Sequence, residues 1–214
     1  MVNPKTYGEK IDNIDAFTFY NKFLFWLPRL QPFINETGRP PMSAQKFINF
    51  FRILYGCGLK ISEGLELERR DFDLDKRTVN IRNTKTTEYS LTTVLPYDIT
   101  MLENMFKTYS KFEKLFPIDR NIAWLYAKQA GKLGGLKIFQ THEGRNIDGI
   151  WISVFRLSCS KRMFEQNASI ELIQRKLRKK SSKSITRPMT DLLNTLLVWE
   201  NEQYSQPTGF EHPN

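Results

Sequence analysis

The segment 43–55 limits the possible folds more than any other part of the chain. Its large apolar side chains recur at intervals of three and four residues: Phe47, Phe50, Phe51 and Leu54. This spacing places them on one face of a helix, with Ser43 as a suitable N-cap and the run 56–58 (GCG) as its end. A stripe of three phenylalanines must be buried, so the chain needs a core built around this helix.

Other segments predict a fold of the α+β class that is mainly helical. Further helices are expected over 16–30, 61–68, 99–116, 150–166, 169–177 and 189–204. Two β-branched runs, 77–82 and 90–95, flank a polar loop at 83–89 and predict a small antiparallel sheet. The turn-rich residues 71–75 lead into these strands, and the Gly-rich stretch 131–149 is expected to be irregular.

The sequence excludes several classes of protein. Its apolar runs, such as 23–27 (FLFWL), are far shorter than the roughly 20 residues that a membrane span needs, and no secretory leader is recognisable. Cys57 and Cys159 are too few for a disulfide framework, and together with two histidines they form no familiar zinc motif. We therefore expect an intracellular protein of the cytoplasm or nucleoid, with no metal, cofactor or membrane partner.

The positive charge is concentrated in the body of the chain. The net charge is +9, but residues 188–214 contain four acids and no base, so residues 1–187 carry 32 − 19 = +13. Seven bases and no acid lie within 175–187. Such a cluster predicts a surface that binds polyphosphate, although a solvated helix end is the alternative. The acidic, apolar helix at 189–204 is expected to dock on the basic body or on a second copy.

Two segments resemble the catalytic domain of the tyrosine recombinases, the phage-integrase family. Residues 54–67 (LYGCGLKISEGLEL) are similar to the family pattern YGTGLRxSELLxL. Residues 153–156 and 160–177 are similar to HxLRHTFATxLLExGxxLxxIQxLLGH. The resemblance spans about 42–200 and implies a recombinase-like domain at 42–188, preceded by an extension (1–41) and followed by a helix and tail (189–214). Because only about forty residues precede it, we expect this sequence to lack the family's separate DNA-clamping domain.

The resemblance implies metal-independent phosphoryl transfer, in which a tyrosine attacks DNA and cations stabilise the phosphate. Two of the family's six catalytic positions are matched, with Lys85 at the leaving-group lysine and Arg156 at the second arginine. The other four differ: Lys60 is at the first arginine, Ser153 at the first histidine, Lys179 at the second histidine and Pro188 at the nucleophile. Lys85 could equally be an ordinary loop lysine, and Arg156 could pair with an acid. Proline has no nucleophile, so we expect no DNA cleavage by the usual route.

Two other places in the sequence could supply chemistry. Tyr204 lies sixteen residues beyond the expected nucleophile and could act on a neighbouring protomer's DNA. His142 and Arg145 repeat the His-x-x-Arg spacing, but in a glycine-flanked segment that predicts a loop.

The leading hypothesis is a protein that binds double-stranded DNA without cutting it, in a regulatory, architectural or recombinase-modulating role. The alternatives are an active strand transferase that uses Tyr204 in trans, and a protein–protein module that forms homo-oligomers through 189–204. The predicted DNA contacts are ten cations: Lys60, Lys85, Arg156, Lys161, Arg162, Arg175, Arg178, Lys179, Lys180 and Lys183.

Overall fold

The computed structural model describes residues 25, 44–82, 89–133, 140–142, 145–147, 153–178 and 189–204, with the backbone alone at 44, 131–133, 140–142, 145–147, 153–154, 189–192 and 204. Its helices are α4 (Ala44–Gly56), α5 (Ile61–Leu65), α6 (Ile99–Phe106), α7 (Arg120–Leu133), α8 (Ser153–Glu165), α9 (Ile170–Lys176) and α10 (Met189–Tyr204). Its strands are β1 (Phe72–Asp73), β2 (Thr78–Arg82), β3 (Tyr89–Thr93), β4 (Gln140–His142) and β5 (Arg145–Ile147). The predicted helix at 16–30 lies outside the described residues, apart from the helical Phe25.

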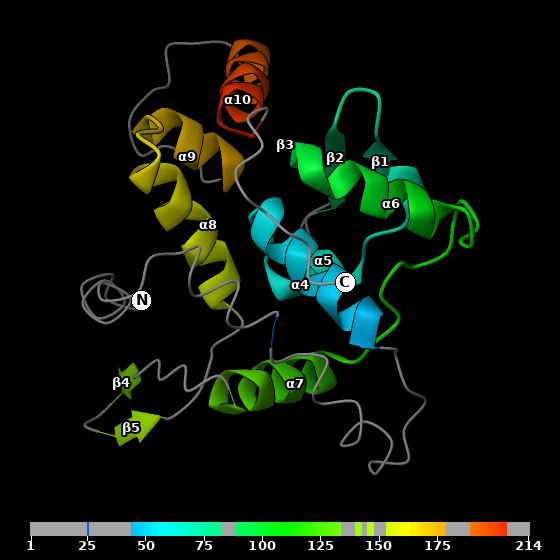
Figure 1. Ribbon diagram of the computed structural model, residues 1–214, viewed down its shortest axis with the longest axis vertical. Helices are drawn as coiled ribbons and strands as arrows, with labels where there is room; N and C mark the ends of the chain where they lie inside the picture. The colour runs from blue at the N-terminus through cyan, green and yellow to red at the C-terminus, as the bar shows by residue number, and fades with distance from the viewer. Residues whose placement is uncertain are drawn as a thin grey trace.

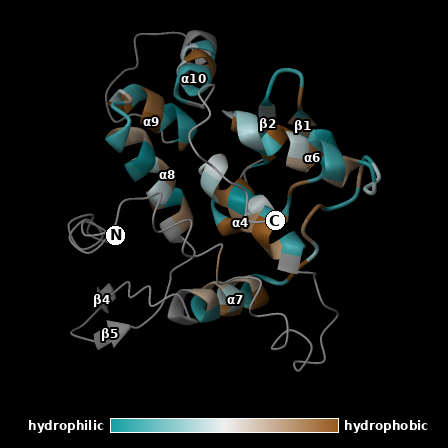
Figure 2. Cartoon of the chain, in the orientation of Figure 1, coloured by the Kyte–Doolittle hydropathy of each residue, from teal (hydrophilic) through white to brown (hydrophobic). Residues whose placement is uncertain are grey.

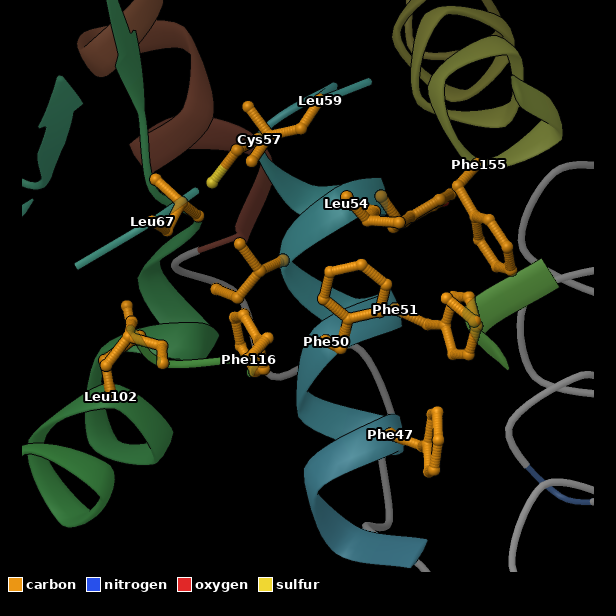
Figure 3. Close-up of a cluster of buried hydrophobic side chains, with 14 of the residues drawn as sticks. Phe47, Phe50, Phe51, Leu54, Cys57, Leu59, Leu67, Leu102, Phe116 and Phe155 are labelled. Carbon is orange, nitrogen blue, oxygen red and sulfur yellow. The ribbon is translucent and has the colours of Figure 1, made fainter. Parts of the chain in front are cut away.

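Helix α4 is the centre of the fold, as its apolar stripe predicts. It lies between α8 and α9 on one side and the sheet with α6 on the other, with α7 beneath it (Figure 1). The stripe is almost completely buried, and so is Ile53 on another side of the helix, whereas other segments of α4 are hydrophilic (Figure 2). Phe51 stacks on Phe155 of α8 with ring centroids 4.8 Å apart, and Phe50 meets Phe116 at 5.0 Å (Figure 3). This aromatic cluster packs α4 against α8 on one side and against the segment that follows α6 on the other.

The sheet confirms the predicted hairpin. Strands β1, β2 and β3 are antiparallel and in that order, and the β2–β3 register runs from Thr78 opposite Thr93 to Arg82 opposite Tyr89. On β2 the buried Val79 and Ile81 alternate with exposed side chains, which is the pattern of a sheet covered on one face. Strand β1 falls in the segment predicted to be a turn.

The C-terminal helices form a second, smaller core. Cys159 and Met163 of α8 pack with Leu172 of α9 and Leu196 of α10. Helix α10 lies on α9 and on β3 of the same chain (Figure 1). It is anchored by Glu200, whose Oε1 is 2.6 Å from Lys176 Nζ. Both side chains of this pair are fully buried, and Thr93 Oγ1 bonds to each of them.

Some predicted boundaries are wrong. Helix α6 ends at Phe106, not 116, and Leu115 instead donates a backbone hydrogen bond to Leu67. Helix α7 was not predicted, because its buried stripe contains small or aromatic residues, Ala123, Tyr126, Ala127 and Ala130, that give a weak hydropathy signal. His142 and Arg145 are paired residues of the β4–β5 hairpin and do not lie in a loop. Among the described helices, none has the length and hydropathy to cross a membrane.

Candidate nucleic-acid interface

The end of α4 brings three separate segments together. Leu59 N bonds to Leu54 O at 2.9 Å and Gly58 N to Tyr55 O at 3.3 Å, which is a Schellman cap with Gly58 at the left-handed position (φ +61°). A Cβ on Gly58 would lie 2.9 Å from Leu177 Cδ2, so only glycine permits this approach. The chain at Gly58 therefore contacts Leu177 at the end of α9. Lys60, the residue before α5, follows two positions later.

One carboxylate, Glu63, is surrounded by three cations. Its Oε2 is 2.6 Å from Arg178 Nη2 and 3.7 Å from Arg156 Nη1, and its Oε1 is 3.7 Å from Lys60 Nζ. Oε2 also accepts a hydrogen bond from the Lys60 backbone N–H at 2.7 Å, as in a capping box. We call Lys60, Glu63, Arg156 and Arg178 the Glu63 cluster.

The two guanidinium groups of the Glu63 cluster share an acceptor. Arg156 Nη1 donates to Gly58 O at 2.6 Å and Arg178 Nη2 to the same oxygen at 3.4 Å. Arg156 Nη2 also bonds to Leu177 O. These bonds to backbone carbonyls hold both groups in fixed positions next to Glu63.

The Glu63 cluster carries a formal charge of +2, since three cations meet one carboxylate. Burial, and next the charge of Arg178, lower the pKa of Arg156. The side chains of Glu63, Arg156 and Arg178 are 11%, 14% and 6% exposed, whereas Lys60 is 63% exposed. Partly buried positive charge without enough counter-charge is a suitable environment for an added anion, and Lys60 provides the open side.

The structure brings Lys60, Arg156 and Arg178 together but directs other predicted contacts elsewhere. Arg162 is buried, with its guanidinium 4.6 Å from the centre of the Tyr55 ring and a hydrogen bond to the Tyr97 hydroxyl at 3.4 Å. The structure thus places the Arg162 side chain in the interior and away from the Glu63 cluster, and its predicted contact with DNA stays a prediction. Lys161 Nζ is 3.8 Å from Glu165 on the same helix.

The basic run that begins at Arg175 does not form one exposed surface. Lys176 is fully buried against Glu200, so its inclusion in a polyphosphate surface is wrong. Arg175 is half-buried, and burial followed by the charge of Arg178 lowers its pKa. The remaining predicted DNA contacts of this run, Lys179, Lys180 and Lys183, lie outside the described residues, as do Lys85 and Pro188.

For Ser153 and Tyr204 the structure describes the backbone alone. Ser153 is the first residue of α8 and Tyr204 the last of α10. Sequence reasoning missed Glu63 as the centre of the cluster. Its spacing of three residues from Lys60 at a helix start was the available signal. Among the described residues no group of histidine, cysteine or acidic side chains could hold a metal ion.

Comparisons with known proteins agree with this architecture. The XerH site-specific recombinase, in a structure bound to a palindromic difH substrate, superposes with a TM-score of 0.54 at 15% identity, covering 87% of this chain and 49% of XerH. The XerA recombinase superposes with a TM-score of 0.53 at 14% identity, covering 88% of this chain and 63% of XerA. This chain thus spans about half to two thirds of their length.

Sequence comparison reaches the same assignment by a separate route. Among curated proteins, none has a sequence that matches this chain significantly. The profile of the phage integrase family, however, matches residues 35–191, which is more than half of the chain and includes α4 to α9. The fold is that of the tyrosine recombinases, and the chain belongs to the phage integrase family.

Proposed function

We propose that this protein binds double-stranded DNA through phosphate contacts at the Glu63 cluster and does not cleave it. The observation that carries the proposal is the +2 charge of that cluster, in which Lys60, Arg156 and Arg178 meet a single carboxylate. Lys60 and Arg156 match the positions of the two phosphate-binding arginines in the family. Lysine keeps the charge of an arginine but not its two-pronged grip, so binding is retained more readily than catalysis.

The proposed lack of cleavage depends on the sequence at the nucleophile. The family register places Pro188 there, and proline offers no hydroxyl for attack on phosphorus. Lysine at the first arginine position and serine at a histidine position would also weaken stabilisation of the transition state and proton transfer. A regulatory, architectural or recombinase-modulating role follows from binding without cleavage.

A nicked duplex tests the proposal. Purified protein is incubated with labelled duplex DNA that carries a nick near the scissile position, which traps any covalent intermediate. Samples are compared on native and denaturing gels across a salt series. We expect a shifted band on the native gel that disappears as salt rises, and no covalent adduct on the denaturing gel.

Each other outcome has a defined meaning. Absence of binding at low salt contradicts the proposal. A covalent adduct that Tyr204→Phe abolishes would establish the alternative, a strand transferase that uses Tyr204. An adduct that survives that substitution would place the nucleophile elsewhere.

A further inference from the structure

Three helices of this protein end in similar left-handed caps, but with different residues at the key position. Gly58 (φ +61°) follows α4, Asn167 (φ +59°) follows α8, and Arg178 (φ +52°) follows α9. Each of the three donates its backbone N–H to the residue three positions before it. Glycine and asparagine tolerate this conformation, whereas the Cβ of an arginine there is crowded by the following carbonyl oxygen. Such a conformation persists only where surrounding contacts hold it, and for Arg178 these include side-chain hydrogen bonds to Cys57 O, Lys176 O, Gly58 O and Glu63.

The role of the Arg178 side chain is visible in its distances to Glu63. Arg178 Nη2 and Glu63 Oε2 are 2.6 Å apart, a strong charge-assisted hydrogen bond. The other two cations are both 3.7 Å from the carboxylate, beyond hydrogen-bond distance. Glu63 is therefore neutralised chiefly by Arg178, and less by Arg156 or Lys60.

We propose that Arg178 is a positioning residue that acts as the counter-ion of Glu63 and so leaves the charges of Lys60 and Arg156 available to a DNA phosphate. Without Arg178, Glu63 would pair with Arg156 or Lys60, and the charge of the cluster would fall from +2 to +1. The matched family pattern has glycine where this chain has Arg178, so this counter-ion is a feature of this chain. The inference rests on the proposed function, because it concerns how the same cluster binds DNA.

The decisive experiment is a double-mutant cycle on DNA binding. Arg178→Gly, Glu63→Gln and the double variant are titrated with a fluorescently labelled short duplex, and anisotropy is followed over a range of salt concentrations. Arg178→Gly should weaken binding about three- to tenfold at low salt and reduce the salt slope by roughly 0.9. The double variant should return to wild-type affinity, because its cluster is again +2. Glycine suits the left-handed cap, so Arg178→Gly is expected to fold.

An exposed ion pair provides the matched control. Lys114 Nζ and Glu66 Oε2 are 2.8 Å apart in the region between α5 and α7, and both side chains are over 40% exposed. Lys114→Gln, alone and combined with Glu66→Gln, makes the same changes in net charge. Both control variants should bind DNA as the wild type does, because the weaker binding of Arg178→Gly comes from the Glu63 cluster and not from a general loss of charge. Arg178→Lys, which keeps the charge, should also retain most of the affinity.

Three results would overturn the inference in distinguishable ways. Wild-type affinity in Arg178→Gly would show that Arg178 plays no part. A double variant as weak as Arg178→Gly would show that Arg178 contacts DNA itself or only supports the fold, and urea unfolding separates these two cases. If the wild type binds no duplex at low salt, the proposed function fails and the inference fails with it.

Discussion

Glu63 and Glu200 differ in the number of cations around them and in how deeply their ion pairs are buried. Glu200 pairs with the single cation Lys176 at 2.6 Å, and neither side chain is exposed at all. Glu63 lies near three cations at a partly exposed site, and one of these cations, Lys60, has a side chain that is 63% exposed. The first arrangement is electrically balanced and closed to solvent, and the second has a surplus of two positive charges.

This difference separates charges that stabilise the fold from charges that can bind a ligand. A buried, balanced pair tolerates no rearrangement, because either partner alone would be an uncompensated charge in the interior. A partly exposed cluster with surplus charge can accept an anion without being dismantled. The basic run at 175–187 contributes to both arrangements, since Lys176 and Arg178 are two residues apart and face different carboxylates.

The largest effect on stability is expected at the balanced pair. Glu200→Ala would leave Lys176 Nζ buried with only the Thr93 oxygens as partners, and should lower the free energy of unfolding by about 3–5 kcal/mol. Urea denaturation followed by circular dichroism measures this change. Glu202→Ala, at an exposed position of the same helix, is the control and should change stability by less than about 0.5 kcal/mol. A loss below about 1 kcal/mol for Glu200→Ala would contradict the comparison.

A smaller loss of stability, with a gain in binding, is expected at the surplus cluster. Glu63→Gln removes the ion pair with Arg178 but retains a carbonyl oxygen for the Lys60 N–H, so the free energy of unfolding should fall by only about 1–2 kcal/mol. DNA affinity at low salt should rise several-fold, because the cluster becomes +3. Parallel urea and anisotropy titrations test both halves. Weaker DNA binding would show that Glu63 orients the cations and does not compete with phosphate for them.

The buried thiol of Cys57 lies near Lys176 and Arg178, and the pH dependence of stability tests its environment. Burial raises the pKa of Cys57 from its ordinary value of 9.0 to about 12, with the nearby charge of Lys176 acting in the opposite direction. The native state then binds this proton more tightly than the unfolded state between about pH 9 and 12. The contribution of the thiol to stability is therefore complete below pH 9 and is lost as the pH rises, by about 1 kcal/mol per pH unit.

Urea denaturation of the wild type and of Cys57→Ala between pH 8 and pH 10.5 measures that contribution. The stability of the wild type should fall more steeply above pH 9 than that of the variant. Equal slopes would mean that the Cys57 thiol is accessible to water in the native state.

Sequence reasoning succeeded where a single segment carries the information. The stripe of α4, the hairpin of β2 and β3 and the bounds of α10 were all predicted from local periodicity. It could not place Lys176 in the interior, because the partner Glu200 lies 24 residues away and is reached only when α10 docks. Arg162 looked like a surface cation for the same reason, since the ring that covers it belongs to α4.

The candidate site was predicted in part. Matching to the family selected Lys60 and Arg156, and the basic run 175–187 selected Arg178 as a DNA-binding cation; the structure places the three together. The central role of Glu63 depends on where three separate segments meet, which no local pattern contains. The left-handed backbone of Arg178 was equally hidden, because an arginine gives no sequence signal for that conformation.

DNA binding at the Glu63 cluster is tested most directly by the salt dependence of binding by Lys60→Gln. Lys60 is the most exposed cation of the Glu63 cluster, so its substitution should not change the free energy of unfolding measurably. The slope of log K against log salt should become shallower by roughly 0.9 relative to the wild type, while Lys114→Gln should leave it unchanged. A wild-type slope in Lys60→Gln, or the same loss of slope in Lys114→Gln, would contradict the claim that the Glu63 cluster is where this protein holds DNA.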